Sequence, residues 1–60
     1  MMEQLPKDPM LLLSVLNMKL RDFYKSLDAL CDDMQIGKEE IQNILAKIDY
    51  FYDEETNQFV

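Results

Sequence analysis

The sequence predicts a mainly α-helical protein with a small β element, in which a three-helix core is followed by a C-terminal β-hairpin. Apolar residues recur at three- and four-residue spacing in three successive segments, which is typical of amphipathic helices. Two short alternating segments surround a polar run near the C-terminus. Because 60 residues suffice for one small core, we expect a single domain over 1–60, with an arm at 1–7, helices within 8–48 and a hairpin at 50–60.

The first helix is expected over 9–23. The Asp8 side chain is suited to accept hydrogen bonds from the amides of the first turn, and Pro9 has no amide hydrogen to leave unpaired there. At 100° per residue, six apolar residues fall within one core-facing stripe about 120° wide. They are Leu12, Leu13, Leu16, Leu20, Phe23 and Tyr24.

The second and third helices are expected over 27–35 and 38–48. Ser26 is placed to cap the second helix, and Glu39 and Glu40 complement the positive end of the third helix dipole. Both helices carry apolar residues at three- and four-residue spacing, which predicts one buried face on each. These faces comprise Leu27, Leu30, Cys31, Met34, Ile41, Ile44, Leu45 and Ile48.

The pair formed by these two helices resembles a helix-turn-helix, because its apolar spacing suits two crossed helices that share a core. Two positions depart from the usual pattern of that motif. Gln35 stands where a Gly commonly takes the left-handed conformation, and Gly37 stands where Ser or Thr commonly caps the following helix.

The hairpin is predicted by alternating apolar residues on both sides of the polar run 53–57. We expect residues 50–53 to pair with residues 57–60 around this turn. A hairpin that follows a helix-turn-helix-like pair gives a winged-helix-like order of elements. Such a scaffold does not by itself define a function.

Composition argues against an enzyme. The chain has no histidine, one Cys and one Gly, so the residue types that build most metal sites, nucleophile–base pairs and phosphate-binding loops are nearly absent. We therefore expect no catalytic residue, cofactor, metal or small-molecule substrate. Asp28, Asp32 and Asp33 lie close together on the second helix, but no loop supplies the carbonyls and the Gly turn that Ca²⁺ sites use, so we interpret them as a solvated acidic face.

Cysteine usage and hydropathy suggest a location. The lone Cys31 is predicted to be buried and inert, and a secreted domain of this size normally carries several disulfides. The longest apolar stretch near the N-terminus is Met10–Leu13, too short for a membrane span. We expect a cytoplasmic protein without a membrane segment.

The first helix carries a second apolar strip, and this strip predicts the function. Leu11, Val15 and Met18 lie on the other side of Lys19 from the core stripe, so the apolar surface is wider than one small domain needs. We expect Leu11, Val15, Met18 and Lys19 to form an interaction surface. Its partner is a second copy of the chain, which gives a homodimer, or another protein. The alternative is cover from within the chain, by Met2 and Leu5 of the arm or by Phe51 and Phe59 of the hairpin.

The alternative function is DNA binding by a winged-helix-like regulator, through Lys38, Gln42 and Asn43 on the third helix. Gln and Asn side chains can make paired hydrogen bonds to adenine. However, residues 26–60 contain two basic and nine acidic side chains, a net charge of −7, which repels phosphates. Nucleic acid is therefore an unlikely partner.

Across nearly its whole length, the chain resembles an uncharacterised family of small bacterial proteins, domain of unknown function 4250. The resemblance rests on several strings taken together, which are Leu5-Pro6-Lys7-Asp8-Pro9-Met10 with Leu12-Leu13-Ser14, Asn17–Tyr24, Ser26-Leu27, Leu30-Cys31, Tyr52–Glu55 and Asn57-Gln58-Phe59. The family has a Gly before the Tyr that ends the third helix, whereas this chain has Asp49. The resemblance implies a small free-standing bacterial protein and supplies no catalytic residues.

Overall fold

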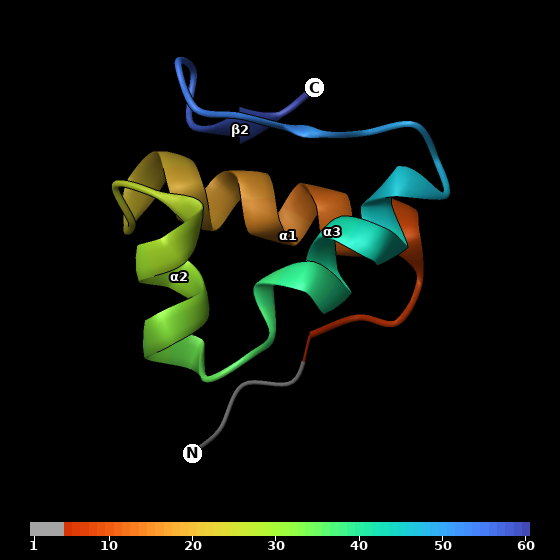
Figure 1. Ribbon diagram of the computed structural model, residues 1–60, viewed down its shortest axis with the longest axis horizontal. Helices are drawn as coiled ribbons and strands as arrows, with labels where there is room; N and C mark the ends of the chain where they lie inside the picture. The colour runs from red at the N-terminus through yellow and green to blue at the C-terminus, as the bar shows by residue number, and fades with distance from the viewer. Residues whose placement is uncertain (1–4) are drawn as a thin grey trace.

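A computed structural model describes residues 5–60 of the chain. It contains three helices and a two-stranded antiparallel sheet (Figure 1), in the order α1 (Pro9–Asp22), α2 (Leu27–Met34), α3 (Lys38–Ala46), β1 (Tyr52–Asp53) and β2 (Gln58–Phe59). The predicted fold class, three helices followed by a C-terminal hairpin, is confirmed. The hairpin lies along one side of α1, and α2 and α3 pack against the other side (Figure 1).

Helix α1 begins as predicted but is capped differently. Asp8 is the N-cap residue in an extended conformation, yet its side chain makes no capping hydrogen bond, so that part of the prediction is wrong. The Asp8 backbone carbonyl instead accepts a hydrogen bond from the Leu12 amide at 2.8 Å, which starts the helical ladder. Pro9 costs nothing at this position because its missing amide hydrogen would have no partner within the helix.

The core stripe of α1 is confirmed for its four leucines and wrong at Phe23. Leu12, Leu13, Leu16 and Leu20 are buried, and Tyr24 is half-buried against the core. Phe23 is 69 % exposed. Helix α1 ends at Asp22, and Phe23 has a φ of −125°, outside the helical range. The rotation of 100° per residue therefore no longer gives the direction of the Phe23 side chain.

The start of α2 is capped as predicted, and Gln35 and Gly37 form the junction between α2 and α3. The Ser26 hydroxyl accepts a hydrogen bond from the Ala29 amide at 3.1 Å, so the predicted cap is confirmed. Gln35 adopts the left-handed conformation with φ of 55°, and Gly37 is the N-cap of α3 without a side-chain hydrogen bond. The Ile36 amide donates to the Cys31 carbonyl at 3.0 Å, which closes the end of α2.

Helix α3 ends two residues earlier than predicted, at Ala46, and a tight turn follows. The Tyr50 amide donates to the Leu45 carbonyl and the Asp49 amide to the Ala46 carbonyl, both at 3.0 Å. Asp49 itself adopts the left-handed conformation, with φ of 63°. This Schellman pattern is usually built with Gly, and Asp49 adopts it here.

The hairpin has the predicted pairing. Tyr52 is opposite Phe59 and Asp53 is opposite Gln58. Phe51 and Val60 extend the ladder through two backbone hydrogen bonds of 3.0 and 2.9 Å. At the turn, the Asp53 carboxylate accepts hydrogen bonds from the Glu55 amide and the Thr56 hydroxyl, which fixes the loop.

One apolar core joins all of these elements. Its buried members are Leu12, Leu13, Leu16, Leu20, Leu27, Leu30, Cys31, Ile41, Leu45 and Phe59. The aromatic rings of Tyr52 and Phe59 meet at a centroid distance of 5.6 Å, so the hairpin is anchored through its inner face. Within residues 5–60, no helix has the length and apolar character needed to cross a bilayer.

Candidate functional site

The α1 strip, formed by Leu11, Val15 and Met18, lies outside the core. Leu11 is 58 % exposed and Met18 is 38 % exposed, whereas Val15 is half-buried. Met10, which immediately precedes Leu11, is exposed as well, so the apolar surface extends toward the start of the helix. The structure therefore brings the predicted interaction residues together on one open side of α1.

Three of the four residues named as alternative covers within the chain lie elsewhere. Phe59 is buried in the core, and Phe51 is exposed and lines a groove beside α3, so these two aromatic residues leave Leu11 and Met18 open to solvent. Leu5 packs against the core rather than over Leu11 and Met18. The fourth proposed cover, Met2, lies outside the described residues.

Two basic residues, Lys19 and Arg21, and one acidic residue, Asp22, lie at the C-terminal end of α1. Lys19 is half-buried and its Nζ atom lies 6.0 Å from the centre of the exposed Phe23 ring, a cation–π arrangement. Arg21 forms an ion pair with Asp22 at 3.0 Å, and the hydrogen bond from Arg21 lowers the pKa of the Asp22 carboxyl. Lys19 and Arg21 also face the negative end of the α1 dipole, a favourable position for cations.

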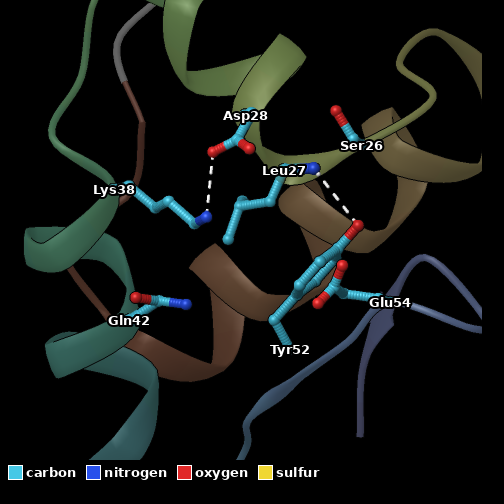
Figure 2. A pocket seen from close by; sticks show the side chains of 7 residues that line it. All are labelled: Ser26, Leu27, Asp28, Lys38, Gln42, Tyr52 and Glu54. Carbon is cyan, nitrogen blue, oxygen red and sulfur yellow. Dashed lines mark hydrogen bonds and ion pairs between the residues drawn. The ribbon is translucent and has the colours of Figure 1, made fainter.

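The nucleic-acid candidates are divided between two hollows beside α3. Lys38 and Gln42 line a polar cavity of about 170 Å³ with Asp28, Tyr52 and Glu54 (Figure 2). The Lys38 ammonium lies 2.9 Å from the Asp28 carboxylate, which raises the pKa of Lys38. This cation is therefore engaged by an acidic neighbour, with a second carboxylate on the cavity wall.

Asn43 faces a second, more open groove of about 320 Å³ between α3 and the hairpin. Gln42 contributes to both hollows, and the remaining lining residues of the groove are Ala46, Phe51, Tyr52 and Phe59. None of these side chains is a cation. The structure thus does not assemble Lys38, Gln42 and Asn43 into a basic surface.

The acidic residues of α2 do not converge on one site. Asp28 pairs with Lys38, and Asp33 accepts a hydrogen bond from the Tyr24 hydroxyl at 2.6 Å. Asp32 is exposed. In the part of the chain that the structure describes, no three acidic or Cys side chains converge in a way that could hold a metal ion.

Sequence reasoning missed a polar network that fastens the hairpin to α1, named here the hairpin clamp and formed by Asn17, Tyr52, Asn57 and Gln58. The Asn17 carboxamide accepts a hydrogen bond from the Phe59 amide at 2.8 Å and donates to the Phe59 carbonyl at 3.1 Å. It therefore satisfies the outer edge of β2 as a neighbouring strand would. Gln58 completes this contact by donating to the Asn17 backbone carbonyl at 3.0 Å.

Asn57 closes the end of α1 from the turn of the hairpin. Its side-chain amide donates to the carbonyls of Leu20 and Tyr24, both at 2.9 Å, and its side-chain oxygen accepts from the Tyr52 hydroxyl at 2.6 Å. The Tyr52 hydroxyl in turn accepts from the Leu27 amide at 3.2 Å, at the start of α2 (Figure 2). Asn57 thereby joins the hairpin to the end of α1, and Tyr52 extends the network to the start of α2.

The buried thiol of Cys31 yields a testable prediction. Burial raises the pKa of Cys31 above its ordinary value of 9.0, and the negative charge of Asp28 raises it further, partly offset by Lys38. Because the thiolate is the reactive form, native protein at pH 8 should react with DTNB at least about tenfold more slowly than protein unfolded in urea. Equal rates in the two states would contradict the burial of this thiol.

The raised pKa of Cys31 also makes the free energy of unfolding depend on pH. A thiol whose pKa is higher in the folded state stabilises the fold at pH values below its unfolded pKa. This contribution is lost as pH rises through the raised pKa, so the free energy of unfolding should fall above about pH 9. A Cys31→Ala variant in parallel urea titrations should lack this component of the pH dependence.

Comparison with known proteins places the chain in a family. A family model described as "Domain of unknown function (DUF4250)" matches residues 6–59, which include all three helices, both strands and the hairpin clamp. No curated protein and no solved structure gives a match. Since the match covers nearly the whole sequence, the chain belongs to the DUF4250 family.

Proposed function

We propose that the protein is a cytoplasmic interaction module, without enzymatic activity, that self-associates through the α1 strip. The observation that carries this proposal is the exposure of Leu11 and Met18 on the outer side of a helix whose other sides are packed. Full burial of a fully exposed side chain of this size contributes about 1.5–3 kcal/mol, and Leu11 and Met18, which are already partly covered, would each contribute a fraction of that. A small domain gains appreciably from such burial because its own interior is limited.

The charge distribution supports a second copy of the chain as the partner. Residues 1–25 contain four basic and three acidic side chains, a net charge of +1, whereas residues 26–60 carry −7. Two copies that approach through α2, α3 or the hairpin bring like charges together. Approach through α1 avoids this repulsion, so the exposed apolar surface coincides with the region that identical copies can share.

DNA binding remains the weaker candidate. Lys38 is paired with Asp28, and the groove beside Asn43 is lined by uncharged residues. Affinity for DNA depends mainly on cations that neutralise phosphates, and the α3 and hairpin region is acidic. The geometry therefore favours a protein partner over a nucleic acid.

The test replaces Val15, at the centre of the strip, by Asp. Val15→Asp should weaken dimerisation at least about tenfold, because the carboxylate would be desolvated and would face its own copy. Light scattering coupled to size exclusion, with protein loaded at high micromolar concentration, measures the mass of each variant. Circular dichroism must confirm that the variant remains folded.

The matched control is Ala29→Asp, which adds the same charge at an exposed position of α2. We expect the wild type and the Ala29→Asp variant to be dimeric and the Val15→Asp variant to be a folded monomer. A monomeric wild type would refute self-association. An equal loss of dimer in both variants would show that net charge, rather than the strip, controls the assembly.

A further inference from the structure

We propose that the outer edge of β1 binds an extended segment of another protein, which adds to the hairpin as an antiparallel third strand. The fitting segment carries Lys or Arg two residues before an apolar residue. This binding site lies on the hairpin and α3 and does not involve the α1 strip. Three features indicate it, namely unpaired backbone groups at Tyr52, two hollows beside them and the negative charge of the hairpin.

The register of the hairpin turns the backbone of Tyr52 away from β2. Phe51 and Val60 exchange two backbone hydrogen bonds. The next pair, Tyr52 and Phe59, is therefore a non-hydrogen-bonded pair, and the amide and carbonyl groups of both point to the outer edges of the sheet. On the β2 edge, the Asn17 carboxamide bonds to both groups of Phe59. On the β1 edge, no hydrogen bond in the described part of the chain engages the same groups of Tyr52.

An extended chain complements such an edge. An antiparallel neighbour supplies a carbonyl and an amide from one residue, at the spacing that an unpaired amide and carbonyl require. Peptide recognition by strand addition uses these main-chain bonds for affinity and adjacent pockets for specificity.

The polar cavity and the groove beside α3 lie along this edge. Tyr52 and Gln42 line both, so the two hollows meet at the unpaired groups. Phe51, which precedes Tyr52, lines the groove, and Glu54, which follows, lines the polar cavity (Figure 2). An antiparallel segment therefore passes the polar cavity before the groove. Because alternate residues of a strand share a face, side chains two residues apart reach the two hollows.

The charges of the two hollows select the side chains. Asp28 and Glu54 provide two carboxylates in the polar cavity, and its one ammonium, from Lys38, pairs with Asp28. The Glu54 carboxylate forms no ion pair in the described part of the chain, and residues 50–60 contain three acidic and no basic side chains. The polar cavity therefore favours a basic side chain. The groove, whose lining residues are uncharged and include the exposed Phe51, favours an apolar one.

A short peptide tests this site. The probe is Thr-Thr-Lys-Thr-Val-Thr-Thr with acetylated and amidated ends, and it is titrated into isotope-labelled protein at low micromolar concentration. NMR records amide shifts and hydrogen exchange. One control peptide carries N-methyl groups on its Lys and Val, and a second exchanges the positions of Lys and Val. Glu54→Gln removes the cavity carboxylate, and Glu55→Gln is the matched control, since Glu55 is exposed and lines neither hollow.

We expect shifts centred on Phe51, Tyr52 and Gln42, and at least about tenfold slower exchange of the Tyr52 amide at saturating peptide. The N-methylated peptide should bind at least about tenfold more weakly, because it lacks the main-chain donors, and the exchanged peptide at least about threefold more weakly. Glu54→Gln should weaken binding of the probe at least about threefold, and Glu55→Gln by a smaller factor.

The controls separate strand addition from simple attraction of charge. Equal binding of the N-methylated peptide would overturn strand addition, and equal binding of the exchanged peptide would overturn the antiparallel order. Equal effects of Glu54→Gln and Glu55→Gln would overturn the role of the polar cavity. No shift at Tyr52 up to millimolar peptide would overturn the site itself. None of these outcomes depends on the α1 strip.

Discussion

Replacing Leu30 by Ala should lower the free energy of unfolding by about 2–5 kcal/mol. Leu30 is completely buried on α2 within the core shared with α1 and α3, so truncation leaves a cavity that its neighbours cannot readily fill. A domain of 60 residues has a total stability of about 3–9 kcal/mol. The variant should therefore be close to unfolded at room temperature.

Urea and thermal denaturation followed by circular dichroism measure this effect. Leu11→Ala is the matched control, because it removes the same atoms from a leucine that is 58 % exposed. At a protein concentration low enough for the wild type to be monomeric, the free energy of unfolding of Leu11→Ala should differ from that of the wild type by less than about 0.5 kcal/mol. Equal destabilisation by the two substitutions would contradict the division of α1 and α2 residues into core and strip.

Replacing Asn57 by Ala should cost about 2–4 kcal/mol, which is large for a residue of a surface turn. The substitution removes three side-chain hydrogen bonds, each contributing about 1 kcal/mol, and leaves the Leu20 and Tyr24 carbonyls without these donors. It also places an Ala in the left-handed conformation, where φ is 56° and Asn is better tolerated.

Two further variants separate these effects. Asn57→Gly loses the same hydrogen bonds but accepts the left-handed backbone, so it should be less destabilising than Asn57→Ala. Asn43→Ala removes an exposed asparagine on α3 and should leave the free energy of unfolding almost unchanged. If Asn57→Ala were as harmless as Asn43→Ala in urea denaturation, the hairpin clamp would not stabilise the fold.

The fold could be predicted because its signals are local. The Ser26 cap acts within a few residues of its own position, and the three- and four-residue apolar spacing defines each buried face without knowledge of its partner. Helix ends were less predictable. Phe23 and Ile48 continue the apolar pattern beyond the last helical turn, where backbone geometry rather than periodicity determines where a side chain points.

The hairpin clamp could not be predicted because its contacts join distant parts of the chain. Asn17 and Phe59 are 42 residues apart, and Asn57 and Leu20 are 37 apart. In the sequence, Asn17 is a polar residue on a helix and Asn57 a turn residue, and neither pattern identifies its partner. The only signal was indirect, since these asparagines belong to the strings that carry the family resemblance.

The α1 strip was predictable in place because its residues share one helical face, and the structure adds that the hairpin aromatics do not cover Leu11 or Met18. The separation of Lys38 from Asn43 follows from helical geometry, because five residues rotate a side chain by about 140° around the axis. That Gln42 lines both hollows depends on where α2 and the hairpin approach α3, which local periodicity does not specify.

Amide chemical shifts recorded from low to high micromolar concentration report directly on self-association through the α1 strip. We expect concentration-dependent shifts concentrated at Leu11, Ser14, Val15 and Met18, with α3 and the hairpin nearly unchanged, and slower tumbling at the highest concentration. Spectra that do not change with concentration, or changes confined to α3 and the hairpin, would contradict it.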